Sequence, residues 1–251
     1  MTEKQLINED LNAYKEAYTE RFPYHWDEEL LLRAYAKKIV ERLGQRQNLR
    51  ILSLGIGGQR VSRTIREQLA IAEYHILEGS KDIIERYRLE TTPPPNVFVH
   101  HTYFETARFD RPFDAIEMGF VLEHVDDPGF ILRKFRPLLK PDGILFAAVP
   151  NARSLHRLLG QSAGYLQDIY ALSRHDLELG HKRYFDSRTI TALVQESGYS
   201  VLETCGLVLK PLTTSQLLQL SLDARVEDAF IEVGYDNPDI ANGVLLVAKA
   251  P

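Results

Sequence analysis

The chain has almost none of the chemistry that cysteine provides. Its 251 residues include a single cysteine, Cys205. One cysteine excludes an internal disulfide and argues strongly against a cysteine-based metal site. We expect Cys205 to be a small buried apolar residue.

Long apolar runs and dense basic runs are missing as well. No stretch approaches the roughly 20 apolar residues that span a bilayer. The first residues, Met1-Thr2-Glu3-Lys4, lack the apolar core of a signal peptide. The formal net charge is −5, so a nucleic-acid substrate would need a local basic patch, and none is visible. We expect a cytoplasmic protein that binds neither a membrane nor nucleic acid.

The remaining composition is that of an ordinary globular protein, with 44% hydrophobic and 26% charged residues. The length suffices for one α/β domain with a full core. Apolar stretches alternate with amphipathic ones, which predicts a parallel sheet with right-handed crossovers. We therefore predict a doubly wound, mostly parallel seven-stranded sheet with helices on both faces. The expected strands are 51–54, 74–78, 97–100, 114–118, 144–149, 200–209 and 244–248.

A glycine turn follows the first expected strand. The run Gly55-Ile56-Gly57-Gly58-Gln59 separates this strand from an amphipathic stretch, 61–70. Glycine takes positive φ at low cost and lets a ligand approach the backbone, and the amides of a helix start offer donors. Glu78 ends the next apolar run, 23 residues after Gly55, where an acid commonly binds the two hydroxyls of a ribose. The pattern predicts an adenosine-type cofactor.

The same turn fits a dinucleotide less well. The dinucleotide fingerprint needs Gly or Ala at its sixth position, which here is Arg60, preceded by Gln59. An NAD(P)-linked oxidoreductase stays open as an alternative that this position disfavours.

A second alternative is a serine hydrolase. The run Gly160-Gln161-Ser162-Ala163-Gly164 matches a nucleophile elbow, and Asp176 and His181 follow in the right chain order. That chemistry needs a strand before the serine, whereas residues 154–159 have a helical pattern. We expect a loop between helices here.

Three further segments narrow the cofactor. They are Val121-Leu122-Glu123-His124-Val125-Asp126-Asp127-Pro128, Leu139-Lys140-Pro141-Asp142-Gly143 and Val149-Pro150-Asn151. In this order they resemble class I S-adenosylmethionine-dependent methyltransferases, most closely the small-molecule branch that includes the ubiquinone-biosynthesis type. The resemblance runs from about Leu30 to Leu209. It implies S-adenosylmethionine as cofactor, S-adenosylhomocysteine as product and methyl transfer to an oxygen or nitrogen of a small-molecule acceptor.

The resemblance also implies which residues contact the cofactor. The glycines of the turn should approach its methionine part, Glu78 its ribose, and Gly79 with residues 103–105 its adenine. The full set is Ser53, Gly55, Gly57, Gly58, Glu78, Gly79, Tyr103, Phe104, Glu105, Met118, Gly119 and His124. Two departures from the family pattern, Ser53 in place of an acid and Gln59 in place of a glycine, keep open a non-catalytic S-adenosylmethionine-binding regulator. Glu117 or Glu123 could supply the missing counter-charge.

Acceptor-binding groups are expected from segments outside the central pattern. We predict a single domain over residues 1–251, with an N-terminal helical lid over about 1–26 and substrate-side insertions at 152–182 and 211–241. His181 is the first choice for a general base, because imidazole titrates near neutrality, and Arg183 could pair with an anionic acceptor. The predicted substrate-binding set is Tyr14, Tyr24, His25, Tyr165, Tyr170, Arg183 and Tyr184.

The remaining expectations concern metals, partners and helix ends. His100 and His101 are adjacent, so a strand points them to opposite faces, and we expect no metal. A homodimer is compatible with the sequence. Asp27 and Asp127 are predicted helix N-caps, the second followed by Pro128, and the second insertion is predicted to be helical over 216–224.

Overall fold

A seven-stranded sheet forms the centre of the molecule in the computed structural model, which describes residues 11–12, 25–57 and 59–251. The strand order is β3-β2-β1-β4-β5-β7-β6. β7 is antiparallel to both of its neighbours, and the other strand pairs are parallel. The predicted mostly parallel seven-stranded α/β fold is confirmed.

The elements alternate along the chain as the sequence pattern predicts. The strands are β1 (Leu49–Leu54), β2 (Ile71–Glu78), β3 (Val97–His101), β4 (Phe113–Gly119), β5 (Leu139–Pro150), β6 (Ser200–Leu207) and β7 (Gly243–Lys249). The helices are α1 (His25–Leu43), α2 (Arg60–Gln68), α3 (Lys81–Thr91), α4 (Pro128–Phe135), α5 (Leu155–Ser162), α6 (Arg174–Glu178), α7 (Ser187–Glu196), α8 (Thr214–Leu218) and α9 (Ala224–Tyr235), with a short 3₁₀ turn at Arg136–Leu138.

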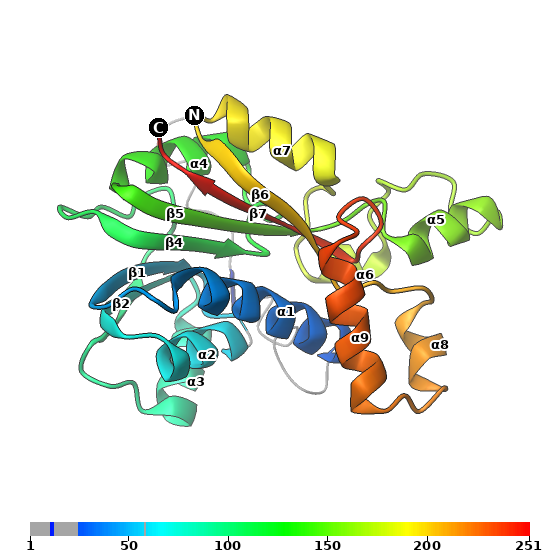
Figure 1. Ribbon diagram of the computed structural model, residues 1–251, viewed down its shortest axis with the longest axis horizontal. Coiled ribbons are helices and arrows are strands. Elements are labelled where there is room, and N and C mark those ends of the chain that lie inside the picture. Colours follow the sequence, from blue (N-terminus) through cyan, green and yellow to red (C-terminus); the bar gives the residue numbers. More distant parts are fainter. Residues whose placement is uncertain (1–10, 13–24, 58) are drawn as a thin grey trace.

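Helices cover both faces of the sheet (Figure 1). Side chains of α1, α2, α3 and α9 share one apolar core with one face of the strands, and those of α4 and α7 share a second core with the other face. Neighbouring residues such as Ile51 and Leu52 enter different cores, since side chains alternate along a strand. This arrangement explains why residues 144–149 of β5 and most of β7 are apolar.

The strand order reverses at β1: β2 and β3 are added on one side of it, and β4 and β5 on the other. β1 pairs with β2 on one side and with β4 on the other. In open α/β sheets, ligands bind beyond the carboxyl ends of the strands at such a switch point. The helices of the two insertions, α5 and α6 and then α8 and α9, gather at the same end of the sheet (Figure 1).

The helix starts confirm one predicted cap and correct another. Asp127 caps α4, accepting a bond of 2.8 Å from the Phe130 amide, and Pro128 is the first helical residue. Asp27 lies inside α1 and is no N-cap, because its carboxylate contacts Lys210 and Thr214 instead. The second insertion contains two helices, α8 and α9, where a single helix over 216–224 was expected.

The expectations about Cys205, membrane-spanning helices and the N-terminal lid have different outcomes. Cys205 is buried and unpaired, as predicted. No helix in the described ranges has the length and apolar character needed to cross a membrane. Most of the predicted lid, residues 1–10 and 13–24, lies outside the described residues, so the lid and the single-domain boundaries stay predictions.

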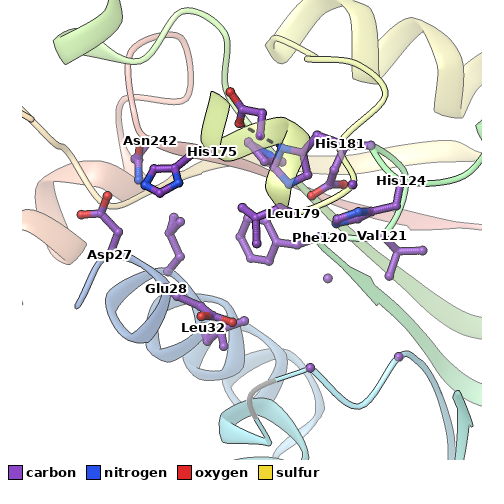
Figure 2. Close-up of a pocket in the computed structure, with 18 of the residues that line it drawn as sticks. Asp27, Glu28, Leu32, Phe120, Val121, His124, His175, Leu179, His181 and Asn242 are labelled. Carbon is purple, nitrogen blue, oxygen red and sulfur yellow. Dashed lines mark hydrogen bonds and ion pairs between the residues drawn. The ribbon is translucent and has the colours of Figure 1, made fainter. Parts of the chain in front are cut away.

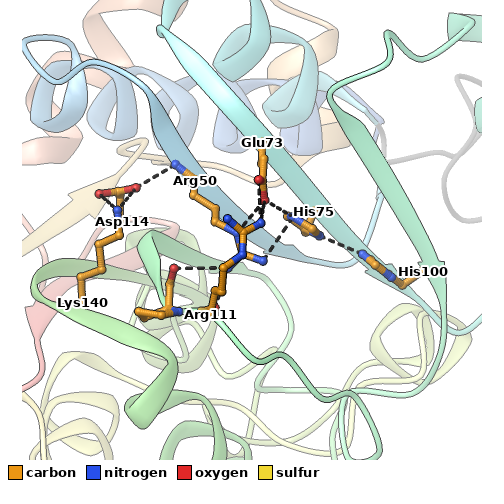
Figure 3. Close-up of polar contacts among 8 residues, drawn as sticks. Arg50, Glu73, His75, His100, Arg111, Asp114 and Lys140 are labelled. Atoms are coloured by element: carbon orange, nitrogen blue, oxygen red, sulfur yellow. Dashed lines mark hydrogen bonds and ion pairs between the residues drawn. The ribbon is translucent and has the colours of Figure 1, made fainter.

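A polar network ties β1, β2 and β4 together near their amino ends and extends through His75 to His100 in the second half of β3 (Figure 3). The Glu73 carboxylate accepts hydrogen bonds from Arg50 at 2.7 Å, from Arg111 at 2.7 and 2.8 Å and from His75 at 3.1 Å. His75 also meets His100, nitrogen to nitrogen, at 2.9 Å. We call this set the amino-end network; its members are Arg50, Glu73, His75, His100, Arg111, Asp114 and Lys140.

Candidate active site

A cavity of about 490 Å³ lies at the carboxyl edge of the sheet. The ends of β1, β2, β4 and β5 form its floor. The start of α1, the segment containing α5 and α6, and the segment around α8 form its walls. Both predicted insertions therefore contribute to the same cavity as the glycine turn.

The glycine turn opens directly onto this cavity. Gly55 and Gly57 have φ of +89° and +52°, which favour glycine, and both line the cavity. A Cβ added to either would meet no protein atom within 4 Å, so the space beside them is open. Gly58 lies outside the described residues. Gln59, where the family pattern has glycine, has the left-handed φ of +65° that explains the family's preference.

Glu78 is fixed beside this turn. Its carboxylate accepts bonds from the Ile56 amide at 3.1 Å and the Ser80 amide at 2.8 Å. Burial raises its pKa, although these amides act in the opposite direction. The side chain lines the cavity at the end of β2, where a ribose-binding acid is expected.

An acid does lie next to Ser53, contributed by another strand. Ser53 on β1 donates a hydrogen bond to Glu117 on β4, which also accepts from Tyr35 at 3.0 Å and from the Gly119 amide at 3.1 Å. Burial raises the pKa of Glu117 to about 7. Glu117 and Gly119 line the cavity, whereas Ser53 lies beneath it. Glu117 thus brings a carboxyl group to the place where the family pattern has its acid.

A histidine and an aspartate form a bonded pair on the opposite wall. Nδ1 of His181 lies 3.0 Å from Oδ1 of Asp176, and both side chains are less than a tenth exposed. Asp176 also accepts from the Ser173 amide at 2.7 Å, from its hydroxyl at 2.5 Å and from Tyr184 at 2.9 Å. Burial by itself would raise the pKa of Asp176, but the hydrogen bonds from His181, Ser173 and Tyr184 outweigh it and lower the pKa well below its usual range. The carboxylate therefore stays ionised and directs a proton to Nδ1, which leaves Nε2 as the basic nitrogen.

Two residues of the Leu-Glu-His-Val segment lie against this pair. The rings of His124 and His181 meet edge to face at 4.7 Å. Glu123 is fully buried, and neither of its carboxylate oxygens has a hydrogen-bond partner among the described residues. Burial raises the pKa of Glu123 to about 7 and lowers that of His124 to about 3.

These groups also bear on metal binding. Glu123, His124 and His181 each offer one ligand atom, and the three atoms lie within 4.8 Å of one another. Imidazole and carboxylate suit several first-row transition metals. From the sequence we expect no bound metal. This expectation stays a prediction, and these three residues are the place at which to test it.

Another group of polar residues lies at the far end of the cavity, opposite His181 and His124. Lys210 donates to Asp27 and to Thr214, the latter at 2.9 Å, and Thr214 donates to Asp27 at 2.6 Å. In Figure 2, Asp27 and Asn242 lie on one side of the cavity and His181 and His124 on the other. None of these three residues was predicted from the sequence to belong to the site.

The comparisons with known proteins agree with this geometry. The family model described as a methyltransferase domain matches residues 26–204. The chain belongs to this methyltransferase family. It is an S-adenosylmethionine-dependent enzyme, and this membership confirms the resemblance seen in its motifs and removes the oxidoreductase alternative.

Similar proteins lie both among sequences and among solved structures. The ubiquinone biosynthesis O-methyltransferase of Aeromonas salmonicida (strain A449) is 23% identical over 207 residues, which cover 77% of this chain and 80% of that protein. The 1,6-didemethyltoxoflavin-N1-methyltransferase of Burkholderia thailandensis has a TM-score of 0.61 at 13% identity, covering 96% of this chain and 85% of that one. The N-methyltransferase NodS of Bradyrhizobium japonicum WM9 has a TM-score of 0.59 at 12% identity, covering 96% and 97%.

The cavity of the methyltransferase fits its cofactor. The open space beside Gly55 and Gly57 would be filled by a side chain at either position, so a ligand can approach the backbone there. Buried oxygens of Gln59 and Glu123 on the cavity wall have no hydrogen-bond partner among the described residues. Such groups are expected where a ligand completes the polar contacts.

The predicted adenine contacts are only partly on the cavity surface. Phe104 lines the cavity, but Gly79, Tyr103 and Glu105 do not. The Leu11 side chain packs against Gly79 and lines the cavity in its place.

The side chain of Met118, a predicted cofactor contact, lies outside the cavity. Its side chain is fully buried in the core shared with α4 and α7, because β4 alternates its side chains and directs Met118 away from the cavity. Its neighbours Glu117 and Gly119 line the cavity instead.

Three of the predicted substrate residues are corrected by the structure. Tyr165 is 91% exposed and does not line the cavity. Tyr170 is also outside it, donating its hydroxyl to Asp186 at 2.6 Å. Arg183 donates to the carbonyls of Val125 and Asp126 at 2.7 and 3.1 Å and does not line the cavity.

The other predicted substrate residues have mixed outcomes. Tyr184 lines the cavity, where its hydroxyl bonds Asp176 and Arg157. His25 begins α1 and does not line the cavity. Tyr14 and Tyr24 lie outside the described residues.

The serine-hydrolase alternative is wrong. Ser162 is the last residue of α5, its side chain is exposed, and no strand precedes it. The Asp176–His181 pair that this alternative singled out does form, but Ser162 does not line the same cavity.

Proposed function

We propose that this methyltransferase transfers the methyl group to a hydroxyl oxygen of a small-molecule acceptor, with His181 as the general base. The observation that supports this most directly is the 3.0 Å bond between His181 and Asp176 inside the cavity. A neutral amine can attack before it loses a proton, whereas most hydroxyl groups need a base. The paired histidine therefore favours an oxygen acceptor over a nitrogen acceptor.

The protein has two tasks in this reaction. The cofactor supplies a methyl group that is already electrophilic, because it is bound to a positively charged sulfur. The cavity must align the acceptor oxygen with that methyl group, and positioning of this kind contributes several kcal/mol. Nε2 of His181 must also accept the hydroxyl proton, which typically contributes about 10²–10⁴ in rate.

Asp176 makes His181 suitable for this role. With Nδ1 bonded to Asp176, Nε2 is the nitrogen that is free to accept a proton. The imidazolium that forms is stabilised by the Asp176 carboxylate, which four hydrogen bonds keep ionised. Glu123 adds a second acid nearby, and a charged His181 would favour its ionised form.

The cofactor contacts follow from the same geometry. We propose that Glu78 binds the ribose hydroxyls and that Gly55 and Gly57 approach the methionine part. Glu117 would provide the negative charge that the family pattern places at position 53, since Ser53 is hydrogen-bonded to it. The cytoplasmic location and the homodimer expected from the sequence stay predictions.

The test compares His181→Ala with a control variant, His101→Ala, whose exposed imidazole does not line the cavity. We expect His181→Ala to lower kcat by about 10²–10⁴-fold and to leave the S-adenosylhomocysteine affinity nearly unchanged. His101→Ala should leave kcat unchanged. Unchanged kcat in His181→Ala would exclude it as the base.

A series of phenols with different acidities separates proton removal from positioning. If His181 removes the proton, the loss in His181→Ala should shrink for phenols that are already ionised at the assay pH. Equal losses across the series would assign His181 a positioning role instead.

A further inference from the structure

The far end of the cavity contains a buried ion pair that the methyl-transfer chemistry does not use. Asp27 comes from α1, and Lys210 and Thr214 come from the segment after β6. All three are at most 9% exposed, and all three line the cavity. Removing two opposite charges from water is costly, so a pair in this position calls for a reason beyond stability.

Several hydrogen-bonding atoms around this pair have no partner among the described residues. They are Oδ1 of Asp27, Nδ1 of His156 and Oγ of Ser154, and all three residues line the cavity. Lys210 donates to two acceptors, which leaves the third hydrogen of its ammonium group. The far end therefore presents an acceptor at Asp27, a donor at Lys210 and two groups of either kind.

The far end of the cavity contains charges of both signs. Arg157, which also lines the cavity, adds a positive charge, and Glu28, whose pKa burial raises to about 7, adds an acid next to Asp27. Asp27 and Lys210 offset each other, and burial together with the charges of Lys210 and Arg157 lowers the pKa of His156 to about 3, so its imidazole is neutral at pH 7. An additional carboxylate would approach the unpaired oxygen of Asp27 and be repelled. A neutral group that both donates and accepts matches the available atoms.

Apolar side chains separate this end from the catalytic histidine. In Figure 2, Phe120 and Leu179 lie between Asp27 and His181, with Leu32 on the α1 side. Phe120 has a left-handed φ of +58°, uncommon for a non-glycine residue, and its amide bonds the Ala148 carbonyl at 2.8 Å. A strained residue on a cavity wall is typical of a binding site.

We infer that Asp27, Lys210 and Thr214, with His156 and Ser154, form an acceptor subsite for a neutral group that donates and accepts hydrogen bonds, such as a carboxamide or a second hydroxyl. This inference rests on the proposed function. The substrate class is then a phenol whose reacting hydroxyl lies at His181 and whose ring contacts Phe120 and Leu179. Its polar group at the opposite end binds the ion pair.

The test measures binding by calorimetry to the enzyme loaded with S-adenosylhomocysteine, so that it does not depend on methyl transfer. The probes are phenol and 4′-hydroxybiphenyl skeletons, each with a carboxamide, a carboxylate or a methyl group opposite the hydroxyl. We expect the carboxamide of at least one skeleton to bind about 10-fold or more tightly than its methyl and carboxylate analogues. Methyl transfer to the same probes is assayed separately.

The variants remove both charges together, so that no lone charge is left buried. Asp27→Leu combined with Lys210→Met should reduce the carboxamide preference to about 3-fold or less, with the S-adenosylhomocysteine affinity retained as the sign of a folded enzyme. The matched control is Glu232→Leu combined with Lys37→Met, which removes a half-exposed pair between α9 and α1 outside the cavity. If the double variant does not fold, Thr214→Val removes one hydroxyl of the subsite and should lower the preference in the same direction.

The outcomes separate the two proposals. Equal binding of the three analogues, preference for the carboxylate, a preference that survives in the cavity variants, or no binding at all would overturn the subsite. A carboxamide preference that the variants abolish, without methyl transfer to any probe, would support the subsite and contradict the proposed reaction.

Discussion

The two polar clusters of this protein lie near opposite ends of the same strands and differ in how completely their atoms are bonded. In the amino-end network, Glu73 alone receives bonds from Arg50, His75 and Arg111, and no member contributes to the unpartnered buried atoms found in the described ranges. The cavity at the carboxyl end contains unpartnered atoms of Glu123, Asp27 and other residues. Buried polar atoms in native proteins are nearly always bonded. We propose that the first cluster stabilises the sheet and that ligands complete the second.

Asp176 is the informative exception within the cavity. It is as fully bonded as Glu73, with four hydrogen bonds to its carboxylate. Its partner His181 contacts the cavity, so this bonding orients a reactive group. Substitutions around His181 in the cavity should therefore lower activity, and substitutions in the amino-end network should lower stability.

The largest effect is expected from Asp176→Asn. The amide can donate a hydrogen bond to Nδ1 of His181, which would stabilise the tautomer with the proton on Nε2 and leave no base facing the acceptor. We expect kcat to fall by about 10²–10⁴-fold. The control Glu178→Gln changes an exposed acid of the same helix that is bonded to Arg174 and His175 and not to His181, and its kcat should stay within a factor of two of wild type. Retained activity in Asp176→Asn would show that the pair does not set the tautomer.

Glu123→Gln should stabilise the protein at pH 8, whereas replacing a hydrogen-bonded structural acid such as Glu73 should destabilise it. Burial raises the pKa of Glu123 from 4.5 to about 7, so between these values the folded protein keeps a proton that the unfolded chain releases. The free energy of unfolding contributed by this group therefore falls as pH rises from 4.5 to 7. The variant should lose this slope and be more stable at pH 8 by up to about 3 kcal/mol.

Denaturant titrations at pH 5 and pH 8 measure this effect. The control Glu67→Gln changes an exposed acid on α2 and should leave the pH dependence unaltered. A wild-type protein whose stability rises across this interval in the same way as Glu123→Gln would contradict the assignment.

Glu78→Ala should weaken S-adenosylhomocysteine binding. A hydrogen bond to a charged group contributes about 1.5–3 kcal/mol, or roughly 10–150-fold in affinity. Calorimetry on Glu78→Ala and on the control Glu85→Ala, an exposed acid of α3, measures the difference. Equal affinities in the two variants would contradict the ribose assignment.

Glu73→Gln should have a smaller effect, confined to stability. Hydrogen bonds from Arg111, Arg50 and His75 lower the pKa of Glu73 to about 2. Its contribution is therefore complete above about pH 4.5 and is lost as pH falls towards 2. We expect a loss of about 1–2 kcal/mol at pH 7, measured by denaturant unfolding, with kcat unchanged. A loss of activity in the folded variant would contradict the separation between the two clusters.

The fold could be predicted from the sequence because its signals are local. Strands covered on both faces are apolar throughout, as in Ile144–Val149, and the helices between them have regular amphipathic patterns. The glycine turn and Glu78 could be predicted for the same reason, since each is placed by the strand that precedes it.

The acceptor end could not be predicted in this way. Asp27 and Lys210 are 183 residues apart, and no local pattern shows that they meet. The local sequence around Asp27 is typical of an N-cap, so it predicted that role and not the contact with Lys210. Tyr165 in the first insertion and Arg183 just after it show the converse error, because aromatic or basic character near His181 does not fix the direction of a side chain.

The difference between the two clusters is tested most directly by measuring kcat and Tm side by side for His181→Ala and His75→Ala. His181 and His75 each have a carboxylate partner, at 3.0 Å and 3.1 Å respectively. We expect His181→Ala to lose about 10²–10⁴-fold in kcat while its Tm changes by about 3 °C at most. His75→Ala should lose several degrees of Tm and keep its kcat. A loss of kcat in folded His75→Ala, or unchanged kcat in His181→Ala, would contradict the assignment of structure to one cluster and chemistry to the other.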